Sequence, residues 1–192
     1  MLSADGEPLD KENYPSIRAA RGEILEQALF QVVHKDGERR WVTYSSRFLR
    51  HQENGPPYAA VISIVDVSRL MAAEESLRLA QSVFDAAGEG IIVTDTDNSI
   101  VAVNPAFTHI TGYRKDDVLG KNPALLASGR HDAEFYRAMW ETMGAQDHWE
   151  GEIWNRRKDG TIYPEWLTIA AMRNGKNEVT HYIGSFSDLS DA

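Results

Sequence analysis

The segment that decides the fold is RKDGTIY at residues 157–163, an Asp-Gly pair between runs of β-forming residues. Such a pair between runs rich in β-branched and aromatic residues is a strong signal for a β-hairpin. A segment of the same kind, HKDGERRW, stands at residues 34–41. Further downstream, VISIVDVS at 61–68 resembles IGSFSDLS at 183–190. The chain therefore contains an internal repeat of three strands joined by two turns.

The spacing inside the two copies supports the repeat. Asp36 precedes Asp66 by 30 residues, and Asp159 precedes Asp188 by 29. Each copy also has a second, polar turn, at 53–57 in the first and at 174–177 in the second. Two matched segments at matched spacing predict that each copy folds as an antiparallel three-stranded unit.

The copies differ upstream, which predicts the domain organisation. The first copy has only 35 residues before its Asp-Gly turn, so we expect residues 1–68 to be the C-terminal part of a truncated domain. Residues 88–192 should form a complete domain. The linker 69–87 lacks Pro and Gly, and its apolar residues recur every three or four positions, which predicts one continuous helix. These residues are Leu70, Ala73, Leu77, Ala80 and Phe84. They fit a coiled-coil seam and, equally, an amphipathic helix packed on its own domain.

Turn-forming residues divide 88–192 into eight elements. We expect strands at 91–94 and 99–103 and short helices at 106–111 and 116–119. A longer helix should begin after Asp132, an N-cap residue, and continue to Met143, with Gly144 ending it. Strands are expected at 148–155, 161–173 and 178–188. This order predicts an α+β domain with an antiparallel sheet.

Five short motifs appear in order through this region. They are NPAF at 104–107, TGY at 111–113, VLGKN at 118–122, RKDG at 157–160 and DLS at 188–190. From Ala80 to Ala192 the chain resembles a PAS sensor domain, and the first copy resembles only the last three strands of another. The resemblance implies a five-stranded antiparallel sheet in the order 2-1-5-4-3, with short helices over one face. It also implies a sensory module of a bacterial signalling protein. The effector in the same full-length chain would be a cyclic-di-GMP synthase or phosphodiesterase, or a histidine kinase.

The strand at 148–155 predicts a binding pocket. Side chains alternate along a strand, so Trp149, Gly151, Ile153 and Asn155 should face the interior. Gly151 would leave a gap in this apolar row, and Asn155 would place an amide at its end. A planar heteroaromatic ligand needs this combination. The alternative is that Asn155 pairs with the backbone and the tryptophans fill a solid core.

The resemblance also implies a cofactor. The residues from Gly120 to Asp159 are similar to those of redox-sensing PAS domains that hold FAD, so FAD is the candidate cofactor. The candidate binding residues are Asn122, Trp140, Trp149, Gly151 and Asn155. The position of Ile92 is a small polar residue in that subgroup and departs from it here. Light-sensing flavin domains need a cysteine, which this chain lacks, and His131 is a poor candidate for a haem ligand.

Composition excludes several classes of function. The chain has 192 residues and a net charge of −9, which argues against a non-specific nucleic-acid binder. It has no run of 18 apolar residues, no signal-peptide pattern and no metal-ligand spacing, so we expect a cytoplasmic protein without a metal site. Glu150, Glu152 and Glu165 are expected to be exposed, so no acid–base pair is predicted and the chain is not expected to be an enzyme.

Two functions remain from the sequence. The first is a sensor that binds a ligand or redox cofactor and passes the signal through helices to an effector. The second is a ligand-free dimerisation or interaction module. Residues 1–68 carry more apolar strand surface than their few preceding residues should cover, including Trp41, Tyr44, Phe48 and the strand 61–65. We therefore expect a homodimer through this part of the chain. Trp154 and Trp166 should point outward and offer a second contact surface.

Overall fold

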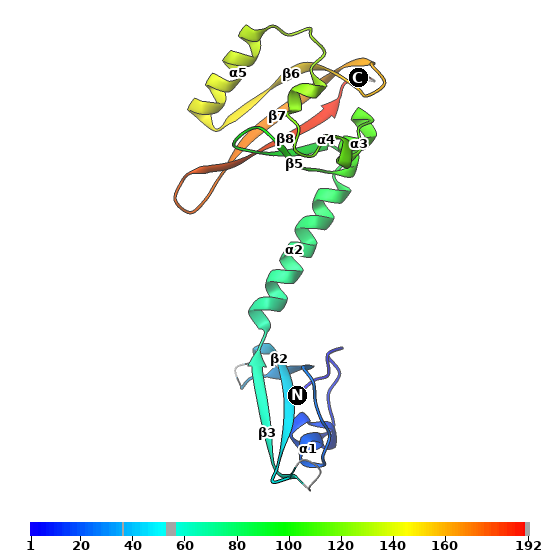
Figure 1. The fold of residues 1–192 in the computed structure, drawn as a ribbon, viewed down its shortest axis with the longest axis vertical. Coiled ribbons are helices and arrows are strands. Elements are labelled where there is room, and N and C mark those ends of the chain that lie inside the picture. Colours follow the sequence, from blue (N-terminus) through cyan, green and yellow to red (C-terminus); the bar gives the residue numbers. More distant parts are fainter. Residues whose placement is uncertain (36, 53–56, 191–192) are drawn as a thin grey trace. The chain divides into compact units, whose positions relative to one another are not determined.

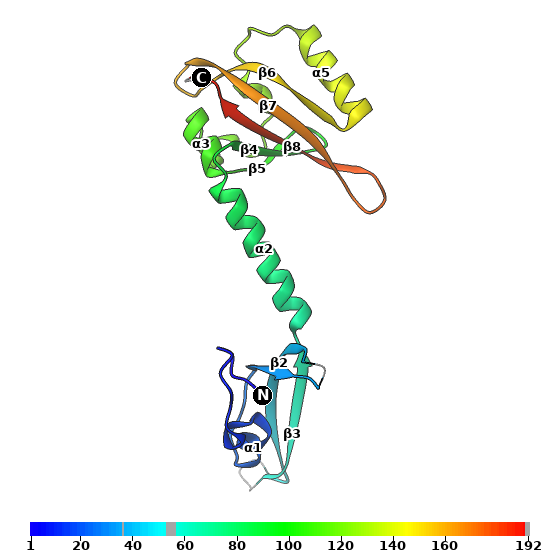
Figure 2. The same cartoon turned by 180° about the vertical axis from the view of Figure 1, so that it is seen from behind.

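The structure is a computed structural model that describes residues 1–35, 37–52 and 57–190 (Figures 1 and 2). It contains two compact units, Met1–Leu79 and Ala80–Ala192. Within the described residues, no helix is both long enough and apolar enough to cross a membrane.

The first unit is built on an antiparallel sheet in the order β1-β2-β3. Its elements are η1 (Lys11–Asn13), α1 (Pro15–Ala20), β1 (Ala28–Val33), β2 (Arg39–Arg50) and β3 (Pro57–Asp66). The predicted hairpin closes at Gly37, whose φ of 87° is a conformation that glycine adopts without strain. Asp36 and residues 53–56 of the second predicted turn, 53–57, lie outside the described residues.

The segment before β1 covers one face of this sheet. Leu25, Phe30, Val42 and Tyr44 form its core, and the rings of Phe30 and Tyr44 meet edge to face at 5.7 Å. Buried Ser46 accepts a hydrogen bond from the Leu25 N–H at 2.8 Å, which ties that segment to β2. The expectation that Tyr44 lacks cover was wrong, because Leu25, Met1 and Leu9 from the segment before β1 belong to the cluster that buries it.

The helix α2 runs without interruption from Ser68 to Ala86, close to the predicted 69–87. None of its residues is buried, and Leu70, Leu77, Leu79 and Val83 are all more than 60% exposed. The hydroxyl of Ser68, the first residue of α2, accepts a hydrogen bond from the Trp41 N–H at 2.9 Å. Whether the predicted seam of Leu70, Ala73, Leu77, Ala80 and Phe84 forms a coiled coil stays a prediction.

The second unit has the predicted fold. Its elements are β4 (Gly90–Asp95), β5 (Ile100–Val103), α3 (Pro105–Thr111), α4 (Lys115–Val118), η2 (Pro123–Leu126), α5 (Ala133–Gln146), β6 (His148–Arg156), β7 (Ile162–Arg173) and β8 (Val179–Asp188). The antiparallel sheet has the order β5-β4-β8-β7-β6, which confirms the order 2-1-5-4-3. In Figure 2, α5 lies beside β6 at the edge of this sheet.

The end of α5 differs from the prediction. The helix passes Gly144 and ends at Gln146, and Asp147 takes the left-handed C-cap conformation with φ 57°. Aspartate tolerates this conformation better than most residues. Its carboxylate is also held by Arg173 at 2.6 Å, so a contact from β7 fixes the end of the helix.

Asn104 holds the N-terminal half of this unit together. Its side-chain oxygen accepts hydrogen bonds from the backbone N–H groups of Ile91 and Phe107, at 2.8 and 2.9 Å. Its NH₂ group donates to the carbonyls of Phe84 and Glu89. One buried amide therefore joins the end of α2 to β4 and α3, which accounts physically for the NPAF motif.

We predict that Gly90→Ala destabilises this unit. A Cβ at Gly90 would lie 2.4 Å from the ring of Phe186, which is buried and cannot move aside. The expected loss is about 1–3 kcal/mol in the free energy of unfolding, measured by urea denaturation. Gly88→Ala is the control, because nothing lies within 4 Å of its Cβ position. Equal stability of the two variants would contradict the close contact.

Candidate functional site

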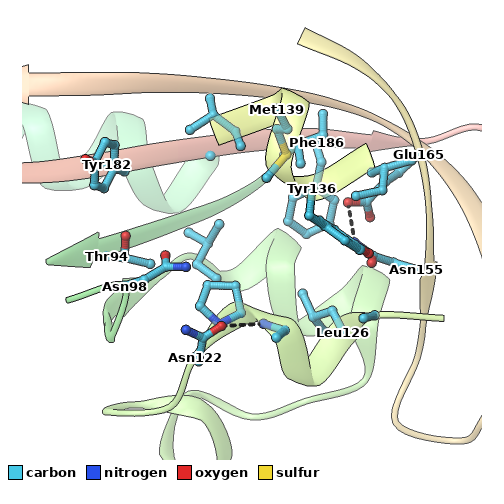
Figure 3. Close-up of a pocket in the computed structure, with 18 of the residues that line it drawn as sticks. Thr94, Asn98, Asn122, Leu126, Tyr136, Met139, Asn155, Glu165, Tyr182 and Phe186 are labelled. Carbon is cyan, nitrogen blue, oxygen red and sulfur yellow. Dashed lines mark hydrogen bonds between the residues drawn. The ribbon is translucent and has the colours of Figure 1, made fainter. Parts of the chain in front are cut away.

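A cavity of about 390 Å³ lies between the sheet of the second unit and the elements η2 and α5 (Figure 3). Its volume falls within the range of small-molecule sites, roughly 300–1,000 Å³. Most of the wall is apolar, from Ile92, Leu126, Met139, Ile153, Leu167, Ile169 and Phe186. Such a wall excludes water and suits a flat, apolar ligand.

Three of the five predicted site residues line this cavity: Asn122, Trp140 and Asn155. Trp140, on α5, packs edge to face on Tyr182 of β8, with ring centroids 5.3 Å apart. Asn122 is exposed, and its side-chain oxygen accepts a hydrogen bond from the Ala124 N–H at 2.9 Å, which caps η2. Asn122 therefore shapes the cavity by starting the η2 turn.

Trp149 and Gly151 are not among the lining residues. A Cβ at Gly151 would lie 3.0 Å from the indole of Trp149, so this ring fills the gap that the glycine was expected to leave. Trp149 packs with Met139, Met143 and Ile169. The expectation of open space at Gly151 was wrong, because a neighbour two residues away on the same strand face occupies it.

The position of Glu165 also differs from the sequence prediction. It was expected to be exposed, but it is only 1% exposed and lines the cavity. The sequence of β7 could have predicted this burial, because every second residue of a strand points to the same face. The residues on this face are Tyr163, Glu165, Leu167 and Ile169. A carboxyl group in a row of otherwise mostly hydrophobic, inward-facing side chains is a candidate for a functional residue.

Glu165 is held by two donors. Asn155 Nδ2 donates to its Oε1 at 2.8 Å, and the Tyr163 hydroxyl donates to its Oε2 at 2.6 Å. Asn155 thus pairs with a side chain, and its Oδ1 receives no hydrogen bond from the described residues. The end of the cavity at β6 and β7 therefore combines an open amide acceptor with a buried carboxyl group.

Burial governs the protonation of this pair. It raises the pKa of Glu165 to about 7, although the hydrogen bonds from Tyr163 and Asn155 act in the opposite direction. Burial and the neighbouring Glu165 also raise the pKa of the Tyr163 hydroxyl, which stays protonated as a donor. The carboxyl group can therefore gain or lose a proton near neutral pH.

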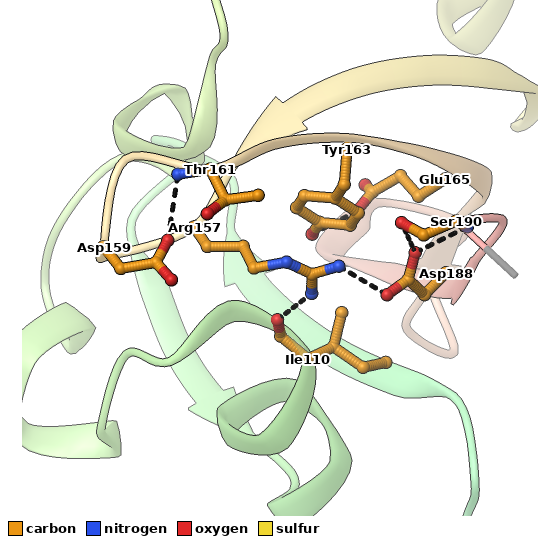
Figure 4. Close-up of polar contacts among 8 residues, drawn as sticks. All are labelled: Ile110, Arg157, Asp159, Thr161, Tyr163, Glu165, Asp188 and Ser190. Carbon is orange, nitrogen blue, oxygen red and sulfur yellow. Dashed lines mark hydrogen bonds and ion pairs between the residues drawn. The ribbon is translucent and has the colours of Figure 1, made fainter.

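A row of polar contacts continues from Glu165 to the end of β8 (Figure 4). The guanidinium of Arg157 lies 3.9 Å from the ring centre of Tyr163 and binds the Asp188 carboxylate at 2.5 Å. Arg157 also donates to the Ile110 carbonyl. Burial pushes the pKa of Asp188 upward, but hydrogen bonds from Ser190 and Arg157 outweigh it, so the carboxylate stays charged. Contiguous contacts thus link the cavity wall to the C-terminal end of the sheet.

The remaining candidates have structural partners. His131 Nε2 accepts a hydrogen bond from the Trp154 N–H at 2.9 Å and does not line the cavity. Trp154 is half-buried under Arg130, whose guanidinium lies 3.9 Å from the ring centre, whereas Trp166 is 45% exposed. Among the residues that the structure describes, no three His, Asp or Glu side chains gather as a metal site would require.

Comparisons with known proteins match the second unit. The nitrogen fixation regulatory protein of Klebsiella oxytoca is 36% identical over 104 residues, which is 54% of this chain and 21% of that protein. The blue-light-activated histidine kinase of Brucella canis is 32% identical over 94 residues, which is 49% of this chain and 19% of the kinase. The chain thus spans about a fifth of the length of these curated relatives.

Solved structures agree in fold. A PAS domain from Colwellia psychrerythraea superposes with a TM-score of 0.57 at 23% identity, covering 61% of this chain and 99% of that domain. A light-oxygen-voltage domain, from work on a flavin analogue, gives 0.51 at 27% identity, covering 62% of this chain and 86% of that one. The PAS domain family matches residues 88–191, more than half of the chain. With this match and the observed sheet order, the chain belongs to the PAS domain family, whose members are sensory modules of signalling proteins.

Proposed function

We propose that the second unit is a redox sensor that binds FAD in the cavity and passes its signal to an effector in the same full-length chain. The observation that carries the proposal is an apolar cavity of about 390 Å³ with an amide and a buried carboxyl group at one end. Two similar proteins add support, since one is named for light activation and another was studied with a flavin analogue. The effector we propose is a cyclic-di-GMP synthase or phosphodiesterase, or a histidine kinase.

The residues present fit a flavin ring. The apolar wall would keep water from the ring, and Asn155 Oδ1 could accept a hydrogen bond from a ring N–H. The chain has no cysteine, so the flavin would be held without a cysteinyl adduct. When bound, FAD would supply the redox chemistry, while the protein supplies orientation and a water-free site.

Transmission would use the polar contacts that begin at the cavity wall. A change in the hydrogen bonding of Asn155 alters the partner of Glu165, and the contacts of Tyr163 and Arg157 lead from there to Asp188. A ligand shifts a two-state equilibrium only if it contacts the two states differently. We infer that the end of β8, around Asp188–Ser190, is the element whose equilibrium is biased.

We predict that FAD added to the refolded protein is retained through gel filtration and that Asn155→Ala weakens this retention. Loss of one hydrogen bond to the ring should raise the dissociation constant by about fivefold to tenfold, measured by quenching of flavin fluorescence. Glu150→Ala is the control, because its side chain is exposed on the same strand. Failure of the wild-type protein to take up FAD would refute the proposal.

Glu165 also makes the stability of this unit depend on pH. Its pKa is about 7 in the folded protein against 4.5 for an ordinary glutamate, so the folded state binds the proton more tightly. The stabilisation is fully present below pH 4.5 and is lost as the pH rises through 7. Asp188 opposes and Arg157 favours the charged form, but burial dominates.

We predict that Glu165→Gln flattens this dependence, because glutamine mimics the protonated acid at every pH. Between pH 5 and 8 the wild-type free energy of unfolding should fall by about 3 kcal/mol relative to the variant. Urea denaturation at four pH values measures this, with Glu152→Gln, exposed on β6, as the control. Parallel curves for wild type and Glu165→Gln would show that the carboxyl group does not titrate in this range.

The second candidate function is dimerisation through residues 1–68, which we infer to be the C-terminal part of another PAS domain. The strand β3 resembles β8 in sequence, and β8 lies between β7 and β4. In the described part of the chain β3 pairs only with β2, and its Val61, Ile64 and Val65 are more than 50% exposed. A strand with the composition of a central strand and an open edge favours pairing with a second copy.

We predict that the chain is a homodimer and that Val65→Lys makes it a monomer. A lysine on an edge strand discourages pairing with another strand. Light scattering at 10–100 µM, roughly the range in which weak dimers form, measures the mass. Val33→Lys is the control, since Val33 is similarly exposed on β1, whose outer edge already bridges to Leu2 through Gln31. A monomeric wild type would contradict this inference.

A further inference from the structure

The cavity contains an unpartnered polar group, the hydroxyl of Thr94. Its side chain is on β4, is only 4% exposed and lines the cavity. Thr94 Oγ1 is the one buried side-chain nitrogen or oxygen in the described part of the chain that has no hydrogen-bond partner. A buried hydroxyl without a hydrogen-bond partner destabilises the folded state. Replacing Thr94 with valine would remove this hydroxyl and keep the shape of the side chain.

The backbone around Thr94 is also irregular. The pairing of β4 with β5 shifts register between Val93 and Thr94, so that Val93 faces Ala102 and Thr94 faces Ile100. A bulge of this kind redirects a side chain and occurs often beside functional sites. The strand thus departs from regular pairing at the residue whose hydroxyl lacks a partner.

The charge of the cavity restricts its ligand. Among the described residues that line it, Glu165 is the only carboxylic acid, and none is Lys, Arg or His. An anionic ligand would meet Glu165 with no cation to balance it, whereas an uncharged ligand avoids this repulsion. The cavity therefore favours an uncharged ring system, and the phosphates of FAD would have to lie outside this lining.

The polar groups lie at two ends of the site. In Figure 3, Thr94 and Asn98 lie on one side of the cavity and Asn155 and Glu165 on the other, with Tyr136, Met139 and Phe186 between them. This inference rests on the proposed ligand-binding role of the cavity and not on FAD as the ligand. We propose that Thr94 is a ligand-binding residue and that the part of the ligand held in the cavity is an uncharged aromatic ring system with hydrogen-bonding groups at both ends, one bonded to Thr94 and the other to Asn155.

The test compares Thr94→Val with Thr94→Ser in the full chain. Valine removes the hydroxyl and keeps the shape, while serine keeps the hydroxyl. The probes are riboflavin, acridone, which is an uncharged tricycle with N–H and C=O at opposite edges, and acridone-4-carboxylate as its charged counterpart. Binding is measured by quenching of tryptophan fluorescence, because Trp140 lines the cavity.

We expect Thr94→Val to stabilise the protein without ligand and to weaken ligand binding. Without ligand, Thr94→Val should melt about 2–4 °C higher than wild type, because a buried unsatisfied hydroxyl is gone. Its dissociation constant for the uncharged probe should rise about fivefold to tenfold, while Thr94→Ser stays within about twofold of wild type. The carboxylate should bind more weakly than acridone.

The outcomes separate this inference from the FAD proposal. If riboflavin binds wild type and Thr94→Val equally, the role of Thr94 is refuted and the flavin proposal stands. If acridone binds with the Thr94 dependence and riboflavin does not bind, the flavin proposal fails and this inference stands. A lower melting temperature for Thr94→Val would mean that the hydroxyl supports the fold, and tighter binding of the carboxylate would refute the ligand class. If no probe binds, the inference is refuted.

Discussion

The second unit is organised around one constraint, the carboxyl group of Glu165 buried inside the sheet. A carboxylate is expensive to remove from water, so its neighbours must donate hydrogen bonds or it must take up a proton. Asn155 and Tyr163 supply the donors, and the raised pKa reflects how incompletely they compensate for the lost water. Glu165 forms part of the polar end of the cavity, and no cation among the described lining residues balances its charge. The polar contacts that lead through Arg157 to Asp188 also begin beside it.

The two buried asparagine side chains of this unit, Asn104 and Asn155, differ in how many of their hydrogen-bonding groups have partners. Asn104 uses both ends of its amide on backbone groups, so it contributes to the fold and has nothing left for a ligand. Asn155 donates a hydrogen bond from its NH₂ group to Glu165, while its oxygen receives none from the described residues. The same side chain thus links three elements at one position and leaves an acceptor at the cavity at the other, and the difference is the number of partners already present.

The repeat shows how one strand plan leads to two surfaces. In the second unit β8 has neighbours on both sides, which places the cavity over the middle of a five-stranded sheet. In the first unit the residues before β1 cover one face, but β3 stays at an edge with exposed valines. The neighbouring strands therefore decide whether the last strand of the repeat is enclosed within a sheet or left at its edge.

The sequence by itself determined the repeat, the order of strands and helices, the unbroken α2 and, through five motifs, the PAS fold, because turns, periodicity and motif spacing are local properties. It placed Asn155 at the cavity through strand alternation and resemblance together, and Asn122 and Trp140 through the resemblance. Only the tertiary structure decided that Trp149 covers Gly151, that Asp147 rather than Gly144 ends α5, and that Thr94 lacks a partner. Each of these depends on a side-chain rotamer, a contact from another strand or the absence of a donor nearby. Such features arise only when segments far apart in the sequence pack together.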